Sequence, residues 1–251
     1  MFNLVSGILM REIELLEILD AAVAKCIDEK NVAIAFSGGL DSAVIAFLAK
    51  KHANVKGYTV GVAGSRDIVW GVHAANLLAI NHQKIELSEK EVLGIAEELR
   101  RKTEISSILI LSYELPVYAL LKFASEKIIL TGAGADELFG GYSRYLRILR
   151  ADPQELKEEL KKDLEKARIE REIEQKVASE LGKQICSPYM DEEVVKFAFS
   201  LSHEKKIYLG RRKVILRDCA RIAGIPPEIY EREKKAAQYS SGVYKVLRKN
   251  L

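Results

Sequence analysis

The sequence predicts an α/β fold in which helices flank a parallel sheet and a helical part follows. Two observations predict it. Short apolar runs alternate with stretches of helical period through the first 150 residues, and alternating β and α units form parallel sheets covered by helices. From Ala151 onward the composition changes to charged helical stretches without a strand pattern. We therefore expect a single domain over 1–251, with an α/β core at about 1–150 and a helical part at about 151–251.

The expected elements of the first part alternate along the chain. Strands are expected at 33–36, 55–62 and 82–88, and a fourth begins at Lys127 and runs into glycines. The expected helices cover 8–29, 41–51, 65–80 with Ser65 as N-cap, 88–101, and a stretch after Pro116. Ligands of parallel sheets bind at the carboxyl ends of strands, so the loops 37–42 and 131–137 are expected to lie at one edge.

The second part is expected to be helical throughout. Within 152–182, one apolar stripe runs among charged residues: Leu156, Leu160, Leu164 and Ala167. Such a stripe indicates an amphipathic helix packed on the core, and a coiled-coil partner remains the alternative. Further helices are expected at about 191–201, 211–223 and 226–231.

The composition argues against several classes of protein. The chain has 39 basic and 36 acidic residues, a balance that does not favour nucleic acid as a partner. Its three cysteines are widely spaced and suggest neither a disulfide framework nor a zinc knuckle, which fits a reducing cytoplasm. No apolar run reaches the roughly 18 residues that cross a bilayer, and no signal peptide is evident. We expect a cytoplasmic protein without a membrane partner.

The stretch AIAFSGGLDSAVIAF, residues 33–47, changes from strand character to helical period at a tight turn. A helix that starts there directs free N–H groups and a partial positive charge at the turn, which favours an anion. The turn is built from small residues that leave room for phosphate oxygens: Ser37, Gly38, Gly39 and Ser42. The alternative is an ordinary connection capped by Asp41 or Ser42. We favour a phosphate loop.

A second motif, TGAGADELFGGYSRY, follows the fourth expected strand at 131–145. The glycines allow close backbone approach to a ligand, and a carboxylate of Asp136 or Glu137 can hold Mg²⁺ beside phosphates. The alternative is a glycine-rich turn whose acidic pair caps the next helix. Because both motifs are expected on neighbouring strands, the ligand-binding interpretation gains weight.

Residues 37–42 resemble the S-G-G-x-D-S pyrophosphate loop of the ATP pyrophosphatase superfamily. Together with DELFGGY at 136–142, they resemble the synthetase domain of asparagine synthetases, in which a segment ending D-E-x-F-x-G-Y follows the loop. The resemblance covers about 15–245 and includes GYTVGVAGSRD, ASELGKQICSPYMDEEVVKFAFSL and RRKVILRDCARIAGIPPEIYEREKKAAQYSSGV. It implies an adenine nucleotide alpha-hydrolase-like fold.

The resemblance also implies an activity and a site. The implied enzyme is an ATP-dependent ligase that activates a small carboxylate as its adenylate, releases pyrophosphate and forms an amide. ATP and Mg²⁺ are the implied cofactors, with Asp41 and Asp136 on the metal. The implied nucleotide contacts are Ala35, Phe36, Ser37, Gly38, Gly39, Asp41, Ser42, Thr59, Val60, Gly61, Gly132, Gly134 and Asp136. Lys234 matches the R-x-K lysine that stabilises developing phosphate charge, and its neighbour Lys235 is the alternative.

Three departures from the family pattern bear on the substrate. Ala133 stands where the synthetases have a glutamate, and Cys186 stands where they have an arginine. The chain also starts without the glutaminase domain and its N-terminal cysteine, so ammonia or a separate glutaminase subunit is the expected nitrogen source. These departures favour an acceptor other than aspartate, unless Glu137 or Glu174 replaces the missing glutamate.

Two other functions stay open at this point. Another branch of the superfamily, such as a tRNA-thiolating or lysidine-type enzyme, usually has cysteine pairs or a basic face, and neither is evident. A non-catalytic nucleotide-binding relative is the second alternative. The expected partners are ATP and a small carboxylate, without nucleic acid, and a homodimer is expected.

Overall fold

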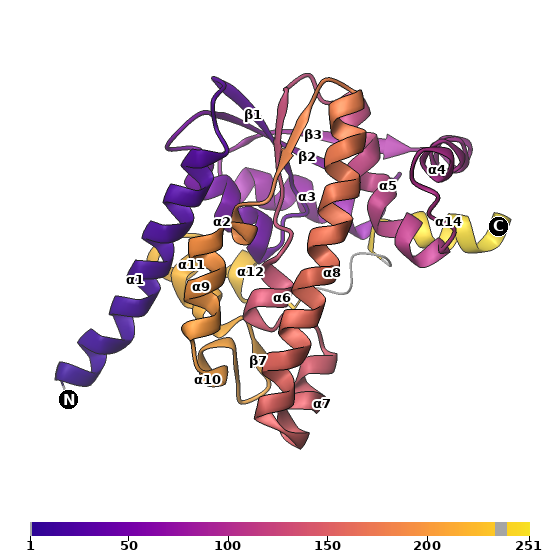
Figure 1. Cartoon of the computed structure of the whole chain (residues 1–251). Coiled ribbons are helices and arrows are strands. Elements are labelled where there is room, and N and C mark those ends of the chain that lie inside the picture. The colour runs from indigo at the N-terminus through magenta and orange to yellow at the C-terminus, as the bar shows by residue number, and fades with distance from the viewer. Residues whose placement is uncertain (1, 234–239) are drawn as a thin grey trace.

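The computed structural model describes residues 2–233 and 240–251, and its centre is a five-stranded parallel sheet (Figure 1). The strand order is β3-β2-β1-β4-β5. The strands are β1 (Asn31–Ala35), β2 (Asn54–Val62), β3 (Asn81–Leu87), β4 (Ile128–Leu130) and β5 (Gln184–Cys186). The order reverses between β1 and β4, and such a switch point is where ligands of open α/β sheets bind. The predicted α/β architecture is confirmed.

Two apolar layers cover the sheet, and the strands alternate between them. Val32 and Ile34 of β1 pack into a first core, whereas Ala33 packs into a second. The first core includes residues of α1 (Phe2–Lys25), α2 (Leu40–Ala49), α3 (Arg66–Leu77), α9 (Glu192–Ser200) and α11 (Val214–Ile222). The second includes residues of α4 (Glu89–Thr103), α5 (Ile108–Phe123) and α14 (Val243–Asn250). Burial on both faces explains the continuous apolar runs of the strands.

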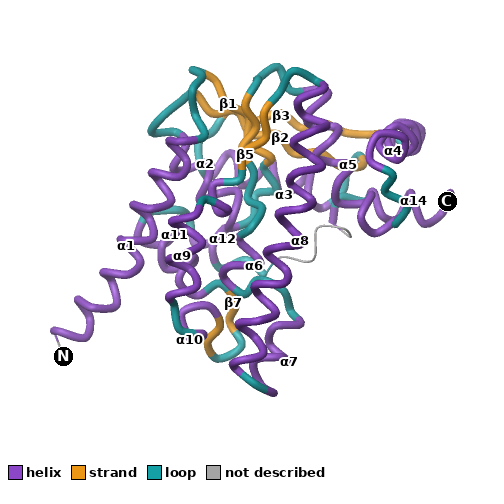
Figure 2. The backbone as a smooth tube through the Cα atoms, in the orientation of Figure 1, coloured by secondary structure: helices purple, strands orange, loops and turns teal. Residues whose placement is uncertain are grey.

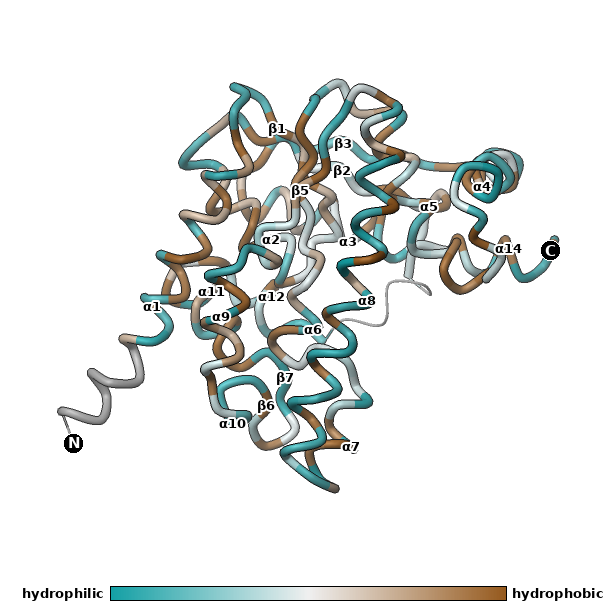
Figure 3. The backbone as a smooth tube through the Cα atoms, viewed as in Figure 1, coloured by the Kyte–Doolittle hydropathy of each residue, from teal (hydrophilic) through white to brown (hydrophobic). Residues whose placement is uncertain are grey.

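The long helix α8 (Pro153–Glu180) crosses the front of the sheet, and hydrophobic and hydrophilic residues alternate along it (Figure 3). Its predicted stripe is buried against the chain itself, with exposed fractions of 8% or less: Leu156, Leu160, Leu164 and Ala167. This confirms the amphipathic helix packed on the core.

The remaining short elements are α6 (Ala135–Phe139), α7 (Arg144–Ala151), η1 (Pro188–Met190), α10 (His203–Lys206), β6 (Ile207–Tyr208), β7 (Arg211–Arg212) and α12 (Pro227–Tyr230).

Three expectations about elements were wrong. The second part is not helical throughout, because β5 completes the sheet beside β4 and β6 pairs antiparallel with β7. The expected helix at 211–223 starts only at Val214, since Arg211–Arg212 form β7. Helix α5 begins at Ile108 and contains Pro116. Burial of apolar side chains before and after the proline outweighs the hydrogen bond that proline removes.

The expectation about the cysteines was also wrong. Cys26, directly after α1, forms a disulfide with Cys186, the last residue of β5, and Cys219 is free and buried. The pairing joins residues 160 positions apart, so spacing gave no indication of it. The cysteines therefore lend no support to a reducing compartment.

Within the described residues, no single helix has the length and apolar character needed to cross a membrane. Only the pair α4 and α5, which meet at a bend of 101°, passes such a test together.

Candidate functional site

The loop between β1 and α2 leaves the helix without a side-chain cap. Gly39 is the N-cap residue, so the N-cap position has no side chain to cap the first turn, and the Gly39 N–H itself donates to the Ser37 hydroxyl over 3.4 Å. Asp41 and Ser42 lie inside the first turn, so the alternative in which one of them caps the helix is wrong. The Ser37 and Ser42 hydroxyls lie 3.4 Å apart, and the Ser42 hydroxyl donates to the carbonyl of Gly39. The loop therefore presents hydroxyls and an uncapped helix start together, as an anion site requires.

Trp70 of α3 fixes the middle of this loop. Its indole Nε1 donates to the Gly38 carbonyl over 2.7 Å. Gly38 has a φ of 67°, and a Cβ there would lie 2.8 Å from both Trp70 Cδ1 and Ala74 Cβ. Only glycine fits this close approach without displacing α3.

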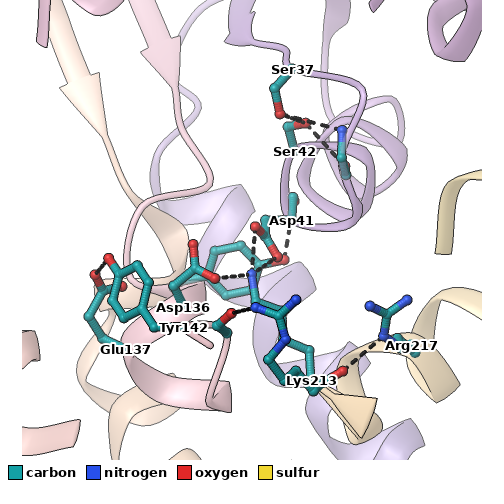
Figure 4. A network of polar contacts seen from close by, with 12 residues as sticks. Ser37, Asp41, Ser42, Asp136, Glu137, Tyr142, Lys213 and Arg217 are labelled. Atoms are coloured by element: carbon teal, nitrogen blue, oxygen red, sulfur yellow. Dashed lines mark hydrogen bonds and ion pairs between the residues drawn. The ribbon is translucent and has the colours of Figure 1, made fainter. Parts of the chain in front are cut away.

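Lys213 joins the two sequence motifs (Figure 4). Its ammonium lies 2.7 and 2.8 Å from the carboxylate oxygens of Asp41 and 2.6 Å from Oδ1 of Asp136. The Lys213 side chain is 10% exposed, against 13% for Asp41 and 38% for Asp136. Although burial opposes its charge, the carboxylates of Asp136 and Asp41 raise the pKa of Lys213 above its ordinary value. The structure thus brings Asp41 and Asp136 to one cation.

The hairpin β6–β7 and a glycine position Lys213. Lys213 precedes α11 with a φ of 56°, in the left-handed region that few non-glycine residues adopt. Arg212 Nη1 donates to the carbonyl of Gly141 over 2.6 Å. A Cβ on Gly141 would lie 1.7 Å from Asp136 Oδ1 and 2.3 Å from Lys213 Cε. Gly141 must therefore lack a side chain for the ion pair between Lys213 and Asp136 to form.

The loop after β4 packs directly on the loop after β1. A Cβ on Gly132 would lie 3.0 Å from Asp41 Cβ and 3.2 Å from the Ser42 nitrogen. On the other side, Gly134 contacts Met190, and the Tyr189 hydroxyl donates to the Asp41 carbonyl over 3.2 Å. The two motif loops and 189–190 therefore form one packed unit.

The residues expected around adenine lie at the end of β1 and along β2. The Phe36 side chain is buried in the first core, so only its backbone can face a base. Its carbonyl accepts from the Thr59 hydroxyl over 2.5 Å, and Thr59 also contacts His82 Nε2 at 2.8 Å. Burial lowers the pKa of His82, which the sequence analysis did not single out. Beyond Gly61, the Val62 nitrogen donates to the Ser241 carbonyl.

Lys234 and Lys235 lie outside the described residues. The residues on either side of 234–239 are anchored at the site. The Arg232 guanidinium stacks on the Trp70 ring at 4.2 Å, and the Ser240 hydroxyl donates to Asp67 over 2.8 Å. The catalytic assignment of Lys234 or Lys235 stays a prediction.

Glu137 and Glu174, the suggested substitutes for the missing glutamate, are both buried and engaged. Glu137 accepts from the Tyr142 hydroxyl over 2.5 Å and points away from Lys213 (Figure 4). Burial, and next the charge of Asp136, raise the pKa of Glu137. Glu174 of α8 forms an ion pair with Arg171. Both carboxylates therefore belong to internal networks.

Glu114 of α5 lies beside the ion pair of Glu174 with Arg171, and its carboxylate is 3.8 Å from Arg171 Nη2. Burial raises the pKa of Glu114 to about 7. The folded chain therefore keeps a proton that the unfolded chain loses near pH 4.5. The free energy of unfolding that Glu114 contributes is fully present below that pH and is lost as pH rises to about 7.

We expect Glu114→Gln to remove this loss. Denaturant titrations at several pH values should show the variant gaining stability over the native chain between pH 4.5 and 7, by up to about 3 kcal/mol. Glu97→Gln, at an exposed position of α4, is the matched control and should change little. A Glu114→Gln difference that stays constant with pH would refute the assignment.

Magnesium fits the residues that are present. Asp41 and Asp136 offer carboxylate oxygens that already converge on one cationic group. Among the described residues, no cluster of three or more His, Cys, Asp or Glu side chains is arranged to hold a metal. Mg²⁺ is commonly held by one or two carboxylates, with substrate phosphates and water completing its shell. Two carboxylates beside an uncapped helix start match that pattern.

Lys213, Trp70 and Gly141 were not singled out as site residues. Lys213 stands in RRKVILR, which resembles the family's K-x-x-L-R helix, so that match was the available indication. Gly141 is the glycine of the D-E-x-F-x-G-Y pattern in DELFGGY, so the motif was its indication. Trp70 carried no such indication, because its contact with the loop depends on how α3 packs.

The chain is 33% identical over 260 residues to a Methanocaldococcus jannaschii protein described as "putative asparagine synthetase 1", glutamine-hydrolyzing, covering 87% of this chain and 48% of that protein. It is 27% identical over 246 residues to the glutamine-hydrolyzing asparagine synthetase B of Escherichia coli, covering 89% and 43%. The chain thus spans about half the length of the curated relatives it matches. A solved NMN synthetase from Francisella tularensis gives a TM-score of 0.46 at 13% identity, covering 92% of this chain and 77% of that one.

The asparagine synthase family model matches residues 14–184 and 182–251, which is nearly the whole chain. The chain therefore belongs to the asparagine synthase family.

Proposed function

We propose that this chain is an ATP-dependent ligase that activates a carboxylate as its adenylate, releases pyrophosphate and forms an amide. The observation that carries the proposal is the convergence of Asp41 and Asp136 on Lys213, beside the uncapped start of α2. Both motif loops meet there at the carboxyl edge of β1 and β4. Family membership supports the same reaction type.

The residues of the chain bind and orient the reactants in this proposal. The phosphates of ATP lie across 37–42, where Ser37, Gly39 and Ser42 receive the leaving pyrophosphate. The acceptor carboxylate attacks the α-phosphorus, so one P–O bond forms while the bond to pyrophosphate breaks. Catalysis then rests mostly on positioning and on stabilising the charge that develops on the leaving oxygens. Lys213 and either Lys234 or Lys235 provide the positive charge that stabilises the leaving oxygens.

The adenine base is proposed to lie against the backbone of β1 and β2. Its contacts are Ala35, Phe36, Thr59, Val60 and Gly61, while Gly38, Gly132 and Gly134 allow the backbone to approach the nucleotide. The buried side chain of Phe36 and the hydrogen bond from Thr59 to its carbonyl support a rigid wall there.

Asp41 and Asp136 would hold Mg²⁺. When bound, the ion neutralises phosphate charge and polarises the reacting phosphoryl group. Lys213 lies between the two carboxylates, offsets their mutual repulsion and would share their oxygens with the ion.

The acceptor is proposed to differ from aspartate. Ala133 carries no proton acceptor, and Cys186 is bonded to Cys26 and carries no charge for an anionic substrate. General-base help is worth about 10²–10⁴-fold, so asparagine formation should be slow by that factor. Free ammonia, an amine on the substrate or a separate glutaminase subunit would supply the nitrogen, and a homodimer remains the expected assembly.

The test is exchange of labelled pyrophosphate into ATP, screened over carboxylates that include aspartate, with Mg²⁺ present. We expect exchange that depends on one acceptor, together with little asparagine formation from aspartate and ammonium. Turnover of aspartate in the ordinary enzyme range of about 1–10³ per second would refute the altered acceptor. ATP binding without exchange for any acceptor would favour a non-catalytic relative instead.

Gly39→Val links that assay to the loop. A valine side chain at the start of α2 should block the approach of phosphate and abolish ATP binding, measured by calorimetry, while circular dichroism stays unchanged. Gly94→Ala is the control, because Gly94 lies in helix α4 and an added Cβ meets nothing within 4 Å. Unchanged ATP affinity in Gly39→Val would contradict the assignment of the loop.

A further inference from the structure

The disulfide between Cys26 and Cys186 faces a cavity of about 690 Å³ at the edge of the sheet. The cavity lies between α1, α8 and β5, and Figure 2 shows β5 between these two helices. Ala22, Lys25, Arg171, Gln175 and Ser187 also line it. Both cysteines are among the residues that line the cavity, and Cys26 as a whole is 8% exposed.

The five residues after Cys186 contact both motif loops. We call 187–191 the bridging segment. The Tyr189 hydroxyl donates to the Asp41 carbonyl, and Met190 packs against Gly134, where a Cβ would lie 3.0 Å from Met190 Cγ. At its far end, Asp191 accepts a 2.8 Å ion pair from Lys25. The C-terminal end of α1 therefore holds the bridging segment at both ends. The disulfide of Cys26 with Cys186 lies just before the segment, and the ion pair of Lys25 with Asp191 lies at its last residue.

Hydrogen bonds connect the disulfide to the loop after β4. The Thr131 nitrogen donates to the Cys186 carbonyl over 2.9 Å. The hydroxyls of Thr131 and Ser187 lie 2.9 Å apart, and the Ala133 nitrogen donates to the Thr131 hydroxyl. Cys186 and Ser187 are thus hydrogen-bonded to Thr131, in the same loop that carries Asp136.

We propose that Cys26 and Cys186 form a redox-modification site whose reduction by a dithiol loosens the bridging segment and lowers the activity of the adjacent site. A dithiol thiolate attacks one sulfur, the S–S bond breaks, and a mixed disulfide forms. The second thiol of the reagent then displaces the other cysteine. Two electrons and two protons pass to Cys26 and Cys186, and the reagent becomes a cyclic disulfide.

Reduction leaves α1 attached to the bridging segment through the apolar core that α1 shares with Tyr189 and through the ion pair of Lys25 with Asp191. The Lys25 side chain is 59% exposed, and exposed ion pairs hold little. The three-residue strand β5 keeps its short pairing with β4 and the hydrogen bond from the Ile185 nitrogen to Gln175 Oε1 of α8. Cys186, whose carbonyl accepts a hydrogen bond from the Thr131 nitrogen, is then no longer joined covalently to the end of α1. The activity measurement of this inference rests on the proposed function, whereas the measurement of hydrogen exchange does not.

The experiment compares oxidised protein with protein reduced by dithiothreitol, with thiols counted by alkylation and mass spectrometry. Hydrogen exchange should quicken selectively in peptides covering 131–133 and 187–191. ATP–pyrophosphate exchange should fall by about tenfold, since small misplacements of reacting groups are costly, and should recover on reoxidation. Cys26→Ser should behave as permanently reduced, whereas Cys219→Ser should keep the sensitivity to reductant.

The outcomes separate the two proposals. Equal hydrogen exchange and equal activity in both redox states overturn the redox site. A uniform rise in hydrogen exchange over the whole chain also overturns it, because that reports global loosening. Absence of nucleotide exchange in both states contradicts the proposed function, and the local hydrogen exchange then decides the redox site alone. The reduced native sequence is the primary sample, so the result stands even where Cys26→Ser does not fold.

Discussion

Gly141→Ala should lower ATP–pyrophosphate exchange by about 10²-fold or more, because misplacing reacting groups by about 1 Å costs that much. The added Cβ would lie 1.7 Å from Asp136 Oδ1 and 2.3 Å from Lys213 Cε, so both side chains must move. Overpacking of this kind also costs about 1–3 kcal/mol of stability. Steady-state exchange assays and denaturant titrations measure the two effects.

Gly94→Ala is the matched control for Gly141→Ala. Gly94 lies exposed inside α4, and a Cβ there meets nothing within 4 Å. Alanine should therefore stabilise the helix by about 0.5–1 kcal/mol and leave the exchange rate unchanged. Native exchange activity in Gly141→Ala would show that the ion pair at Lys213 lies outside the reacting site.

Lys213→Met should destabilise the fold by about 3 kcal/mol, since removing one partner of a buried ion pair leaves the other charges uncompensated. Asp41 and Asp136 would then repel each other across the former ammonium position. The double variant Lys213→Met/Asp136→Asn should recover part of that stability without recovering activity. Lys196→Met, at an exposed pair with Glu193, is the control and should cost less than about 1 kcal/mol.

The same variant tests the metal assignment without an activity assay. In Lys213→Met the two carboxylates lose their competing cation, so Mg²⁺ should bind more tightly. Thermal unfolding in rising MgCl₂ should then show a larger increase in midpoint for Lys213→Met than for the native chain, and none for Lys213→Met/Asp136→Asn. Equal midpoints at all Mg²⁺ concentrations in Lys213→Met would argue against a metal at Asp41 and Asp136.

Local patterns in the sequence determined most of the sheet and the place of the two loops. Four strands and the helices between them follow from apolar periodicity and from N-caps such as Ser88, whose capping box with Glu91 is formed. Parallel strands place their carboxyl ends at one edge, so the neighbouring positions of 37–42 and 131–137 followed from the alternation of elements. The apolar stripe of α8 was also predictable, because its residues recur every three or four positions in successive turns of one helix.

The tertiary structure decided the cation that joins the motifs and the covalent link beside them. Lys213 meets Asp41 across 172 positions, and Cys26 meets Cys186 across 160. Strand β5 has three residues and β7 has two, which is too short for a period to be read. Periodicity reports which face of an element is apolar, but it does not report which distant element packs against that face. Only the packing of α1 and α11 on the sheet, together with the pairing of β5 at the sheet's edge, brings these side chains within bonding distance.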